Sequence, residues 1–200
     1  MGTRLNIIVD MLKKTETYHK LITAAAACFA EKGFSATSVR EISTQAGISQ
    51  GAMYTYFKSK DDLIKAIVLE EQNSSLTSHN VSSNGTYFER LCAQVTSCIS
   101  DVGYPVTHQL WVEIIAESAR NPELRKTYIS SDIIMRQSIA GIIAEGIAVG
   151  EFRRDINLEE ITIILFAFID GLIARKAINA SFSFNRDLPT FFALMSKLLK

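Results

Sequence analysis

Apolar side chains recur every three or four residues along most of this chain, which is the spacing of one face of an α-helix. The clearest stripe ends before Gly33, a residue type favoured just past a helix end, and consists of Tyr18, Leu21, Ile22, Ala25, Ala26 and Phe29. Val, Ile and Thr are common, but no alternating pattern bounded by turns indicates a strand. The chain is therefore predicted to be all-α, with about nine helices and no internal repeat.

Two short helices follow the first one. Ser38 and Glu41 form a capping box, in which each side chain accepts a hydrogen bond from the backbone N–H of the other residue. Gly47 ends this helix, and Ser49 can cap a second helix that begins at Gln50. Two short helices joined by a turn that contains glycine predict a helix-turn-helix.

Caps and breaks mark the later helices. Leu63 restarts the apolar pattern after a polar stretch, and 73–85 is rich in Ser and Asn, which indicates a loop, a frayed helix end or a boundary. Three glycines weaken the helical pattern near 139–149. The remaining predicted helices span 88–102 and 106–119 or begin at Asn121-Pro122, at Asn157, and at Asp187 with Pro189.

Charge is unevenly distributed, although the 200 residues carry no formal net charge. Residues 1–65 contain nine Lys or Arg and six Asp or Glu, a net charge of +3, whereas residues 66–200 contain twelve and fifteen, a net charge of −3. The basic front indicates an anionic partner for that part of the chain. With 48% hydrophobic residues, the chain can also bury a sizeable core.

The cysteines and the apolar segments indicate a cytoplasmic protein. Cys28, Cys92 and Cys98 are odd in number and form no Cys-x-x-Cys pair, so we expect small buried thiols in a reducing compartment. The run Leu5–Leu12 is interrupted by polar residues and lacks a cleavage site for secretion. No apolar stretch reaches the roughly 20 residues of a membrane span, so no membrane partner is expected.

The composition of the stretch "GISQGAMYTYF" has a physical reason if its helix enters a DNA groove. Gly51 and Ala52 would let the backbone approach DNA closely, while Met53 and Phe57 face inward. Gln50 and Thr55 can bind base edges. Phosphate oxygens are within reach of Tyr54, Tyr56 and Lys60.

The run "AAACFAEKGFSATSVREISTQAGISQGAMYTYFKSKDDLIKAI" resembles the DNA-binding domain of the TetR family of repressors, without a gap over roughly 17–67. The resemblance implies an arm at 1–13, a DNA-binding domain at 14–60 and a ligand-binding and dimerisation domain at 61–200. The implied DNA contacts are Thr37, Ser38, Arg40, Ser49, Gln50, Gly51, Ala52, Tyr54, Thr55, Tyr56 and Lys60. Gln50 and Ala52 depart from the Lys or Arg and the Thr or Ser of many members, which favours adenine and a thymine methyl as their contacts. A solvated helix face is the alternative for these side chains.

The segment 161–173 is almost wholly apolar and must be buried on two sides. In the resembled family the last two helices form a four-helix dimer interface, which would place 158–178 and 187–199 against a partner; burial inside one monomer is the alternative. The implied interface residues are Ile161, Leu165, Phe168, Leu172, Phe191, Leu194 and Leu198. Asp170, inside the apolar run, is expected at a helix seam with a hydroxyl or amide partner.

A ligand pocket is expected between helices of the second domain, with Trp111 as a wall because it is the only tryptophan. The implied lining is Phe88, Trp111, Ile115, Tyr128, Met135 and Phe166, and ordinary core packing is the alternative for each. Glu113 and Glu117 could meet a cationic group or face solvent. The helix from Lys60 to Leu69 is expected to transmit binding to the recognition helix.

Two other classes of protein compete with this interpretation. Glu16 and His19 have the Glu-x-x-His spacing of di-iron bundles, but neither His79 nor His108 has a glutamate three residues before it. A helical adaptor without DNA binding is the second alternative. We expect no catalytic residue, cofactor or metal. The sequence thus predicts a homodimeric, ligand-responsive repressor that binds a palindromic operator and is released by a small hydrophobic effector.

Overall fold

The computed structural model describes residues 2–78, 85–100 and 106–200, and for 2–12 and 77–78 it describes the backbone alone. Within these ranges the chain forms nine α-helices and no strand, which confirms the all-α prediction. The helices are α1 (Gly2–Lys32), α2 (Val39–Gln45), α3 (Gln50–Met53), α4 (Lys60–Ser78), α5 (Tyr87–Ser100), α6 (His108–Arg120), α7 (Pro122–Ala148), α8 (Leu158–Ile178) and α9 (Phe184–Leu199).

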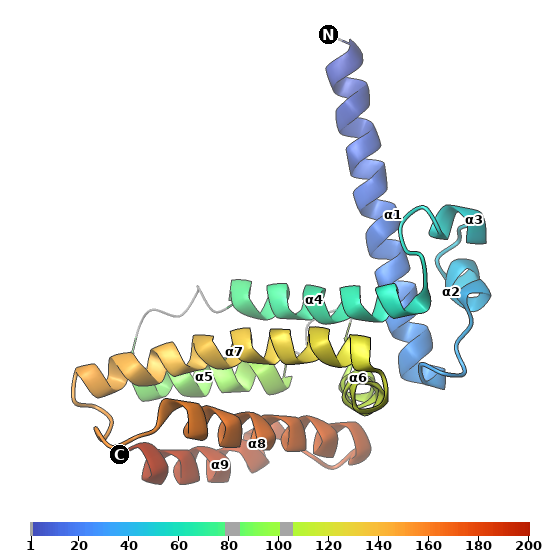
Figure 1. The fold of residues 1–200 in the computed structure, drawn as a ribbon. Coiled ribbons are helices and arrows are strands. Elements are labelled where there is room, and N and C mark those ends of the chain that lie inside the picture. The colour runs from blue at the N-terminus through green and yellow to red at the C-terminus, as the bar shows by residue number, and fades with distance from the viewer. Residues whose placement is uncertain (1, 79–84, 101–105) are drawn as a thin grey trace.

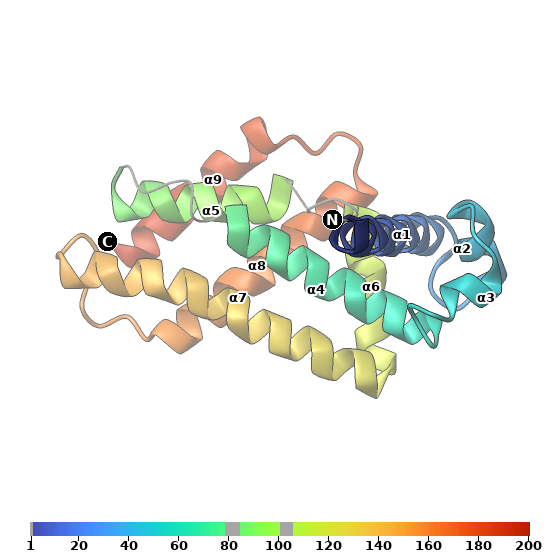
Figure 2. The same ribbon diagram turned by 90° about the horizontal axis from the view of Figure 1, so that it is seen from above.

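The helices form two groups. Figure 1 shows α1 standing across one end of a stack made by α4 to α9, with α2 and α3 beside it. Within the stack α4 and α5 pack along α7, and α8 contacts both α6 and α7. The view from above shows α2 and α3 at one end and the C-terminus at the other (Figure 2).

The apolar interior is divided into two clusters. The first cluster joins α1, α2 and α3 to the front of α4 and to α6, through fully buried residues such as Leu63, Ile64 and Ile114. The second cluster joins α5, α7, α8 and α9. Trp111 of α6 packs against both clusters. The first cluster therefore extends well past residue 60, where the sequence places the boundary between the two domains.

Glycines at two helix positions act in opposite ways. Gly33 adopts a φ of +78° and donates its N–H to the Phe29 carbonyl at 2.9 Å, which ends α1 as expected. Gly146, by contrast, lies inside α7, which continues through Gly141 and Gly146 to Ala148. A Cβ at Gly146 would overlap the ring of Phe152, so this glycine is needed for close packing.

Several boundaries differ from the sequence prediction. The last helix begins at Phe184 rather than at Asp187, because the Asp187 carboxylate accepts the N–H of Ser183 at 2.8 Å and so fastens the preceding turn. Pro189 consequently lies inside α9. Helix α4 continues to Ser78, and 79–84 and 101–105 lie outside the described residues. From Gly2 onward, the expected arm is the first part of α1.

Two further expectations concern membrane segments and thiols. None of the described helices has the length and the apolar character that crossing a membrane requires. Cys28 is buried and Cys92 and Cys98 are partly buried, and all three thiols are free.

Candidate nucleic-acid interface and internal cavity

Helix α3 and the residues just after it have one side that is buried in the protein and one side that is exposed. The Ser49 oxygen accepts the Ala52 N–H at 3.1 Å, which confirms the predicted cap. Met53 and Phe57 are 0% and 5% exposed and fix the inner side of this segment in the first cluster. On the outer side, Tyr54 is 53% exposed. The segment therefore presents a polar surface that is held from behind by apolar packing.

The turn before α3 places it at an angle to α2. Gly47 adopts a φ of +69°, and the Ile48 N–H binds the Ser43 carbonyl at 3.0 Å. The Ser43 hydroxyl also donates to the Met53 sulfur at 3.5 Å, across the two helices. This arrangement is a helix-turn-helix, as the sequence predicts.

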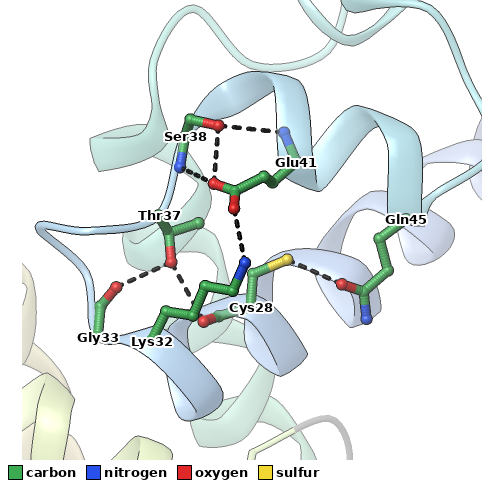
Figure 3. A network of polar contacts seen from close by, with 7 residues as sticks. All are labelled: Cys28, Lys32, Gly33, Thr37, Ser38, Glu41 and Gln45. Atoms are coloured by element: carbon green, nitrogen blue, oxygen red, sulfur yellow. Dashed lines mark hydrogen bonds and ion pairs between the residues drawn. The ribbon is translucent and has the colours of Figure 1, made fainter.

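A polar network fastens the start of α2 to the end of α1 (Figure 3). The Ser38 N–H donates to Glu41 Oε2 at 2.8 Å and the Glu41 N–H donates to Ser38 Oγ at 3.2 Å, so the predicted capping box is present. Lys32 Nζ lies 2.6 Å from Glu41 Oε1. The Lys32 ammonium and the two Ser38 hydrogen bonds lower the pKa of Glu41 to about 2.

Thr37 belongs to this network rather than to the outer surface. Its side chain is 2% exposed, and its hydroxyl contacts the carbonyls of Cys28 at 3.1 Å and Gly33 at 2.8 Å. The Cys28 thiol in turn donates to Gln45 Oε1 at 2.9 Å (Figure 3). A DNA contact through the Thr37 side chain is therefore not supported, because the hydroxyl is enclosed by the protein.

Lys60 is also turned inward. Its ammonium donates to the carbonyls of Phe34, Ser35 and Thr37 at 2.6, 3.2 and 2.9 Å, and lies 4.6 Å from the centre of the Phe34 ring. In this structure the Lys60 ammonium, which was expected to contact a phosphate, is hydrogen-bonded instead to the loop between α1 and α2.

The other expected DNA contacts lie at or near the outer surface. Tyr56 is half-buried against the first cluster, and the Thr55 hydroxyl donates to the Ala52 carbonyl at 2.6 Å, so it is partly engaged. Ala52 is intermediate in exposure. The exposed members are Ser38, Arg40, Ser49, Gln50, Gly51, Tyr54 and Thr55.

A narrow cavity of about 50 Å³ lies between α4, α5, α6, α7 and α8. Its apolar and aromatic lining comes mainly from α6, α7 and α8, and its polar lining mainly from α4 and α7. The lining residues are Glu71, Gln72, Ser75, Cys98, Trp111, Tyr128, Ser131, Asp132, Met135, Phe166, Ile169, Asp170 and Ile173.

Asp170 forms a polar junction in the cavity wall. The Trp111 indole N–H donates to Asp170 Oδ1 at 3.2 Å, and the Tyr128 hydroxyl lies 3.4 Å from Oδ2. Asp170 therefore has the hydroxyl partner that the sequence predicts, and the Trp111 indole is an additional donor. Burial raises the pKa of Asp170, the hydrogen bond from Trp111 opposes the rise, and the charge of Asp132 adds to it. Burial also raises the pKa of Tyr128, and the charge of Asp170 adds to this rise.

The expected pocket residues are only partly those of the cavity. Trp111, Tyr128, Met135 and Phe166 line it, whereas Phe88 and Ile115 do not. Phe88 packs on the second cluster.

The two glutamates considered on α6 have other contacts. Glu113 accepts the backbone N–H of Phe34 at 2.7 Å, and Glu117 is 7% exposed and pairs with Arg120 at 2.9 Å. Neither glutamate lines the cavity. Three acidic residues line it, Glu71, Asp132 and Asp170. The sequence argument singled out Asp170 as a residue at a helix seam, but it missed Glu71 and Asp132 because their positions resemble an ordinary solvated helix face.

The expected dimer interface requires a similar correction. Leu165 and Phe191 are 0% and 7% exposed and belong to the second cluster of their own chain. Phe168 and Leu194 are 41% and 43% exposed, whereas Ile161, Leu172 and Leu198 are partly buried against the second cluster. Ile164, which the prediction omitted, is 47% exposed.

The di-iron alternative has no structural counterpart in the described part of the chain. Glu16 pairs with Lys20 at 2.6 Å, and His19 is exposed. Among the described residues, no group of three His, Cys, Asp or Glu side chains is arranged to hold a metal ion.

A helix-turn-helix joined to a helical domain with an internal cavity defines a class of DNA-binding regulators. Residues 21–67 match the family model "Bacterial regulatory proteins, tetR family", and residues 89–188 match "BetI-type transcriptional repressor, C-terminal". The chain belongs to the TetR family of bacterial transcriptional regulators, whose members are DNA-binding proteins rather than enzymes.

A curated relative agrees with this assignment, and two solved structures share the fold. The "HTH-type transcriptional regulator UidR" of Escherichia coli K12 is 29% identical over 164 residues, which cover 79% of this chain and 80% of UidR. The structure of FadR from Bacillus subtilis with stearoyl-CoA has a TM-score of 0.73 at 24% identity and covers 90% of this chain and 96% of FadR. A transcriptional regulator from Saccharomonospora viridis in complex with choline has a TM-score of 0.78 at 21% identity and covers 92% and 98% of the two chains.

Proposed function

We propose that this protein is a cytoplasmic repressor that binds a (pseudo)palindromic DNA operator as a homodimer and is released by a small effector in the cavity. The observation that carries the proposal is the orientation of α3. Its inner side is fixed by Met53 and Phe57, which leaves Gln50 and Tyr54 exposed on the side that would enter a major groove. Phosphate contacts would position the helix, and Gln50 would contact a base edge.

The proposed dimer interface is the exposed face of α8 and α9. Ile164, Phe168 and Leu194 are large apolar side chains on this face, each between 41% and 47% exposed. Gly171, also exposed, has no atom within 4 Å of the place where a Cβ would stand, so a partner helix could approach closely there. Exposed large apolar side chains on both helices favour association with a second copy.

Two contacts would connect the cavity with the DNA-binding end. Trp111 lines the cavity, and Glu113, two residues later on α6, binds the Phe34 N–H next to α2. Asn121, at the α6–α7 junction, donates to Asp61 Oδ1 at 2.6 Å near the start of α4. An effector that moves α6 would therefore shift the loop before α2, through Phe34, and the start of α4, through Asp61. These two segments flank α2 and α3 in the chain. This proposal adds α6 to the expected transmission through Lys60–Leu69.

The effector must bind the DNA-incompetent arrangement more tightly than the competent one, because tight binding alone shifts no equilibrium. The cavity is narrow, so a ligand larger than a few water molecules has to separate its helices. Structures with this fold bind ligands as different as stearoyl-CoA and choline. The fold alone therefore does not define the effector, and the lining side chains must do so.

Selection from random-sequence duplexes, followed by gel-shift with the purified protein, tests the DNA-binding part. A recovered sequence with two-fold symmetry would support a repressor, and a failure to enrich any sequence would favour the adaptor alternative. Light scattering at micromolar concentration tests the dimer. Phe168→Glu would place a charge in the interface, at a cost of several kcal/mol if it stays unpaired. Ile129→Glu, at a position on α7 that is 49% exposed, is the matched control and should leave the dimer intact.

A further inference from the structure

Helix α7 has an apolar side that the described part of the chain leaves exposed. Ile129, Ile133 and Ile134 are between 40% and 49% exposed. Figure 2 shows α7 along one edge of the helical stack. Single apolar residues at a surface are common, but three isoleucines on neighbouring turns of one helix indicate an interaction surface.

This side of α7 has a bulky half and a small half. Residues three or four positions apart lie on the same side of a helix, and here all of them are exposed or half-buried. The bulky residues precede Gln137 and the small ones follow it. The set, called the α7 face below, is Ile133, Ile134, Gln137, Ala140, Gly141 and Ala144.

Gly141 has no role in the packing of its own chain. Among the described residues, no atom lies within 4 Å of the place where its Cβ would stand, whereas Gly146 of the same helix is needed to make room for Phe152. Glycine inside a helix is less stable than alanine, so its use at position 141 has a cost without a benefit to this fold. Close approach of a partner from outside would supply the benefit.

The α7 face is complementary to a second copy of itself. If two α7 helices run antiparallel with Gln137 of both at a two-fold axis, Ile133 and Ile134 of one copy lie opposite Gly141 and Ala140 of the other. The bulky half of each helix then fills the small half of its partner, and the contact is reciprocal, as two-fold symmetry requires. A parallel pairing would place isoleucine against isoleucine and leave a gap between the small halves.

The charges beside the α7 face favour the same arrangement. Lys126 lies on α7 before the bulky half and Glu145 lies after the small half, so antiparallel helices bring each lysine towards the glutamate of the other copy. Within the chain, Lys126 pairs with Glu123 at 2.7 Å and Glu145 with Arg90 at 3.2 Å. The side chains of Lys126 and Glu145 are 74% and 57% exposed, so both remain accessible to a partner.

A surface hollow adjoins the α7 face. Its lining includes Ile133, Gln137 and Ala140 of α7 and Leu158 and Thr162 at the start of α8. The hollow leaves room for side chains of a partner helix beside the seam.

We propose that the α7 face binds the α7 face of a second copy in this antiparallel arrangement, and that the contact joins two of the proposed α8–α9 dimers. One helix on each side buries less surface than a standard interface, so this contact should be weaker than the α8–α9 dimer. Its regulatory meaning, the joining of two repressors on neighbouring operators, rests on the proposed function.

Sedimentation velocity of the full chain, from micromolar to submillimolar concentration, tests the contact. The wild type should form a species with the mass of two dimers as the concentration rises. Gly141→Leu should lower the association constant by at least about tenfold, because the added side chain occupies the place of the partner's isoleucine. Its melting temperature should not fall, since the position is open and leucine is the better helix former.

Ala93→Leu is the matched control. It adds leucine at an exposed position on α5 and should associate like the wild type. The absence of a larger species at every concentration, or an unchanged association constant for Gly141→Leu, overturns the proposal.

A charge exchange tests the orientation. Lys126→Glu and Glu145→Lys should each weaken association roughly twofold to fivefold at low salt, because each places like charges near one another. The double variant restores opposite charges and should associate like the wild type. A double variant that associates no better than the single ones contradicts the antiparallel arrangement.

Phe168→Glu separates this inference from the proposed dimer. A folded Phe168→Glu chain, checked by circular dichroism, should still form pairs at high concentration, and adding Gly141→Leu should abolish them. If Phe168→Glu chains remain monomeric at every concentration, the inference fails. If Phe168→Glu instead behaves like the wild type while Gly141→Leu alone gives monomers, the α8–α9 dimer fails and the α7 contact survives.

Discussion

The Glu113 carboxylate accepts the backbone N–H of Phe34 at 2.7 Å, a contact between residues 79 positions apart in the chain. It connects α6, which carries Trp111 into the cavity wall, with the turn between α1 and α2. The same carboxylate lies close to Gly33, where a Cβ would come within 3.2 Å of Glu113 Oε1. Glycine at position 33 therefore has two roles. It adopts the positive φ that ends α1, and it leaves room for the Glu113 side chain of α6.

Removal of the Glu113 carboxylate should weaken this connection. Glu113→Ala leaves the Phe34 N–H without its acceptor, and we expect the free energy of unfolding to fall by about 1–3 kcal/mol. Glu113→Gln keeps an acceptor oxygen and should lose less. Urea unfolding followed by circular dichroism measures both. If Glu113→Ala is as stable as the wild type, the contact does not contribute in solution.

Lys60 and Lys58 should have different effects. Lys60→Ala removes three hydrogen bonds to carbonyls and should lower the free energy of unfolding by roughly 1–3 kcal/mol, with little change in the salt dependence of DNA binding. Lys58 is exposed and directly follows the segment 50–57, which is proposed to bind DNA. Lys58→Ala should therefore reduce the slope of log K against log salt, where K is the DNA-binding constant, by about one unit. If Lys60→Ala reduces the salt slope and Lys58→Ala does not, then Lys60 leaves the loop carbonyls and binds phosphate when DNA is present.

Gln50 and Tyr54 should separate base from backbone contacts. Gln50→Ala should relax preference at one base pair in each half-site and cost roughly 1–3 kcal/mol on the best duplex alone. Tyr54→Phe should weaken binding to selected and random duplexes by a similar factor, since phosphate contacts carry no sequence information. Fluorescence anisotropy on both duplexes provides the comparison, and equal losses for Gln50→Ala would show that it contacts no base.

Asp170 should make the unliganded protein less stable at neutral pH. Its pKa is raised in the folded state, so its contribution to stability is greatest below its ordinary pKa and is lost as pH rises through the raised value. Asp170→Asn should therefore melt at a higher temperature than the wild type at pH 7, and the difference should shrink as the pH is lowered. Asp132→Asn breaks the pair with Arg136 and should bring no such gain. Thermal melts between pH 4 and pH 7.5 decide the matter; a lower melting temperature for Asp170→Asn at pH 7 would contradict this account.

The sequence was most informative where a local rule acts alone. The capping box at Ser38 and Glu41, the Ser49 cap and the turn at Gly47 depend on neighbours only a few residues away, and each is present in the structure. Spacing alone also identified Met53 and Phe57 as the inner side of the recognition segment.

Predictions failed where long-range contacts decide the outcome. Thr37 and Lys60 look like polar surface residues, but the Thr37 hydroxyl contacts the carbonyls of Cys28 and Gly33, at the end of α1, and the Lys60 ammonium binds carbonyls of the loop before α2. Leu165 and Leu194 are equally apolar, yet one is buried in its own chain and the other is 43% exposed. The acidic lining could not be found from spacing, because Glu71 and Asp170 lie on different helices and line the same cavity only after folding.

The separation of the cavity from the recognition segment has an evolutionary consequence. None of the described lining residues comes from α2 or α3, and none of the expected base contacts lies in the second cluster. Substitutions in the cavity wall can therefore change which effector binds without changing the DNA sequence that is recognised. Substitutions among the base contacts can likewise change the DNA sequence without changing the effector. A duplicated gene could acquire a new inducer while it keeps its old operator, provided that Glu113 and Asn121 continue to join the two halves.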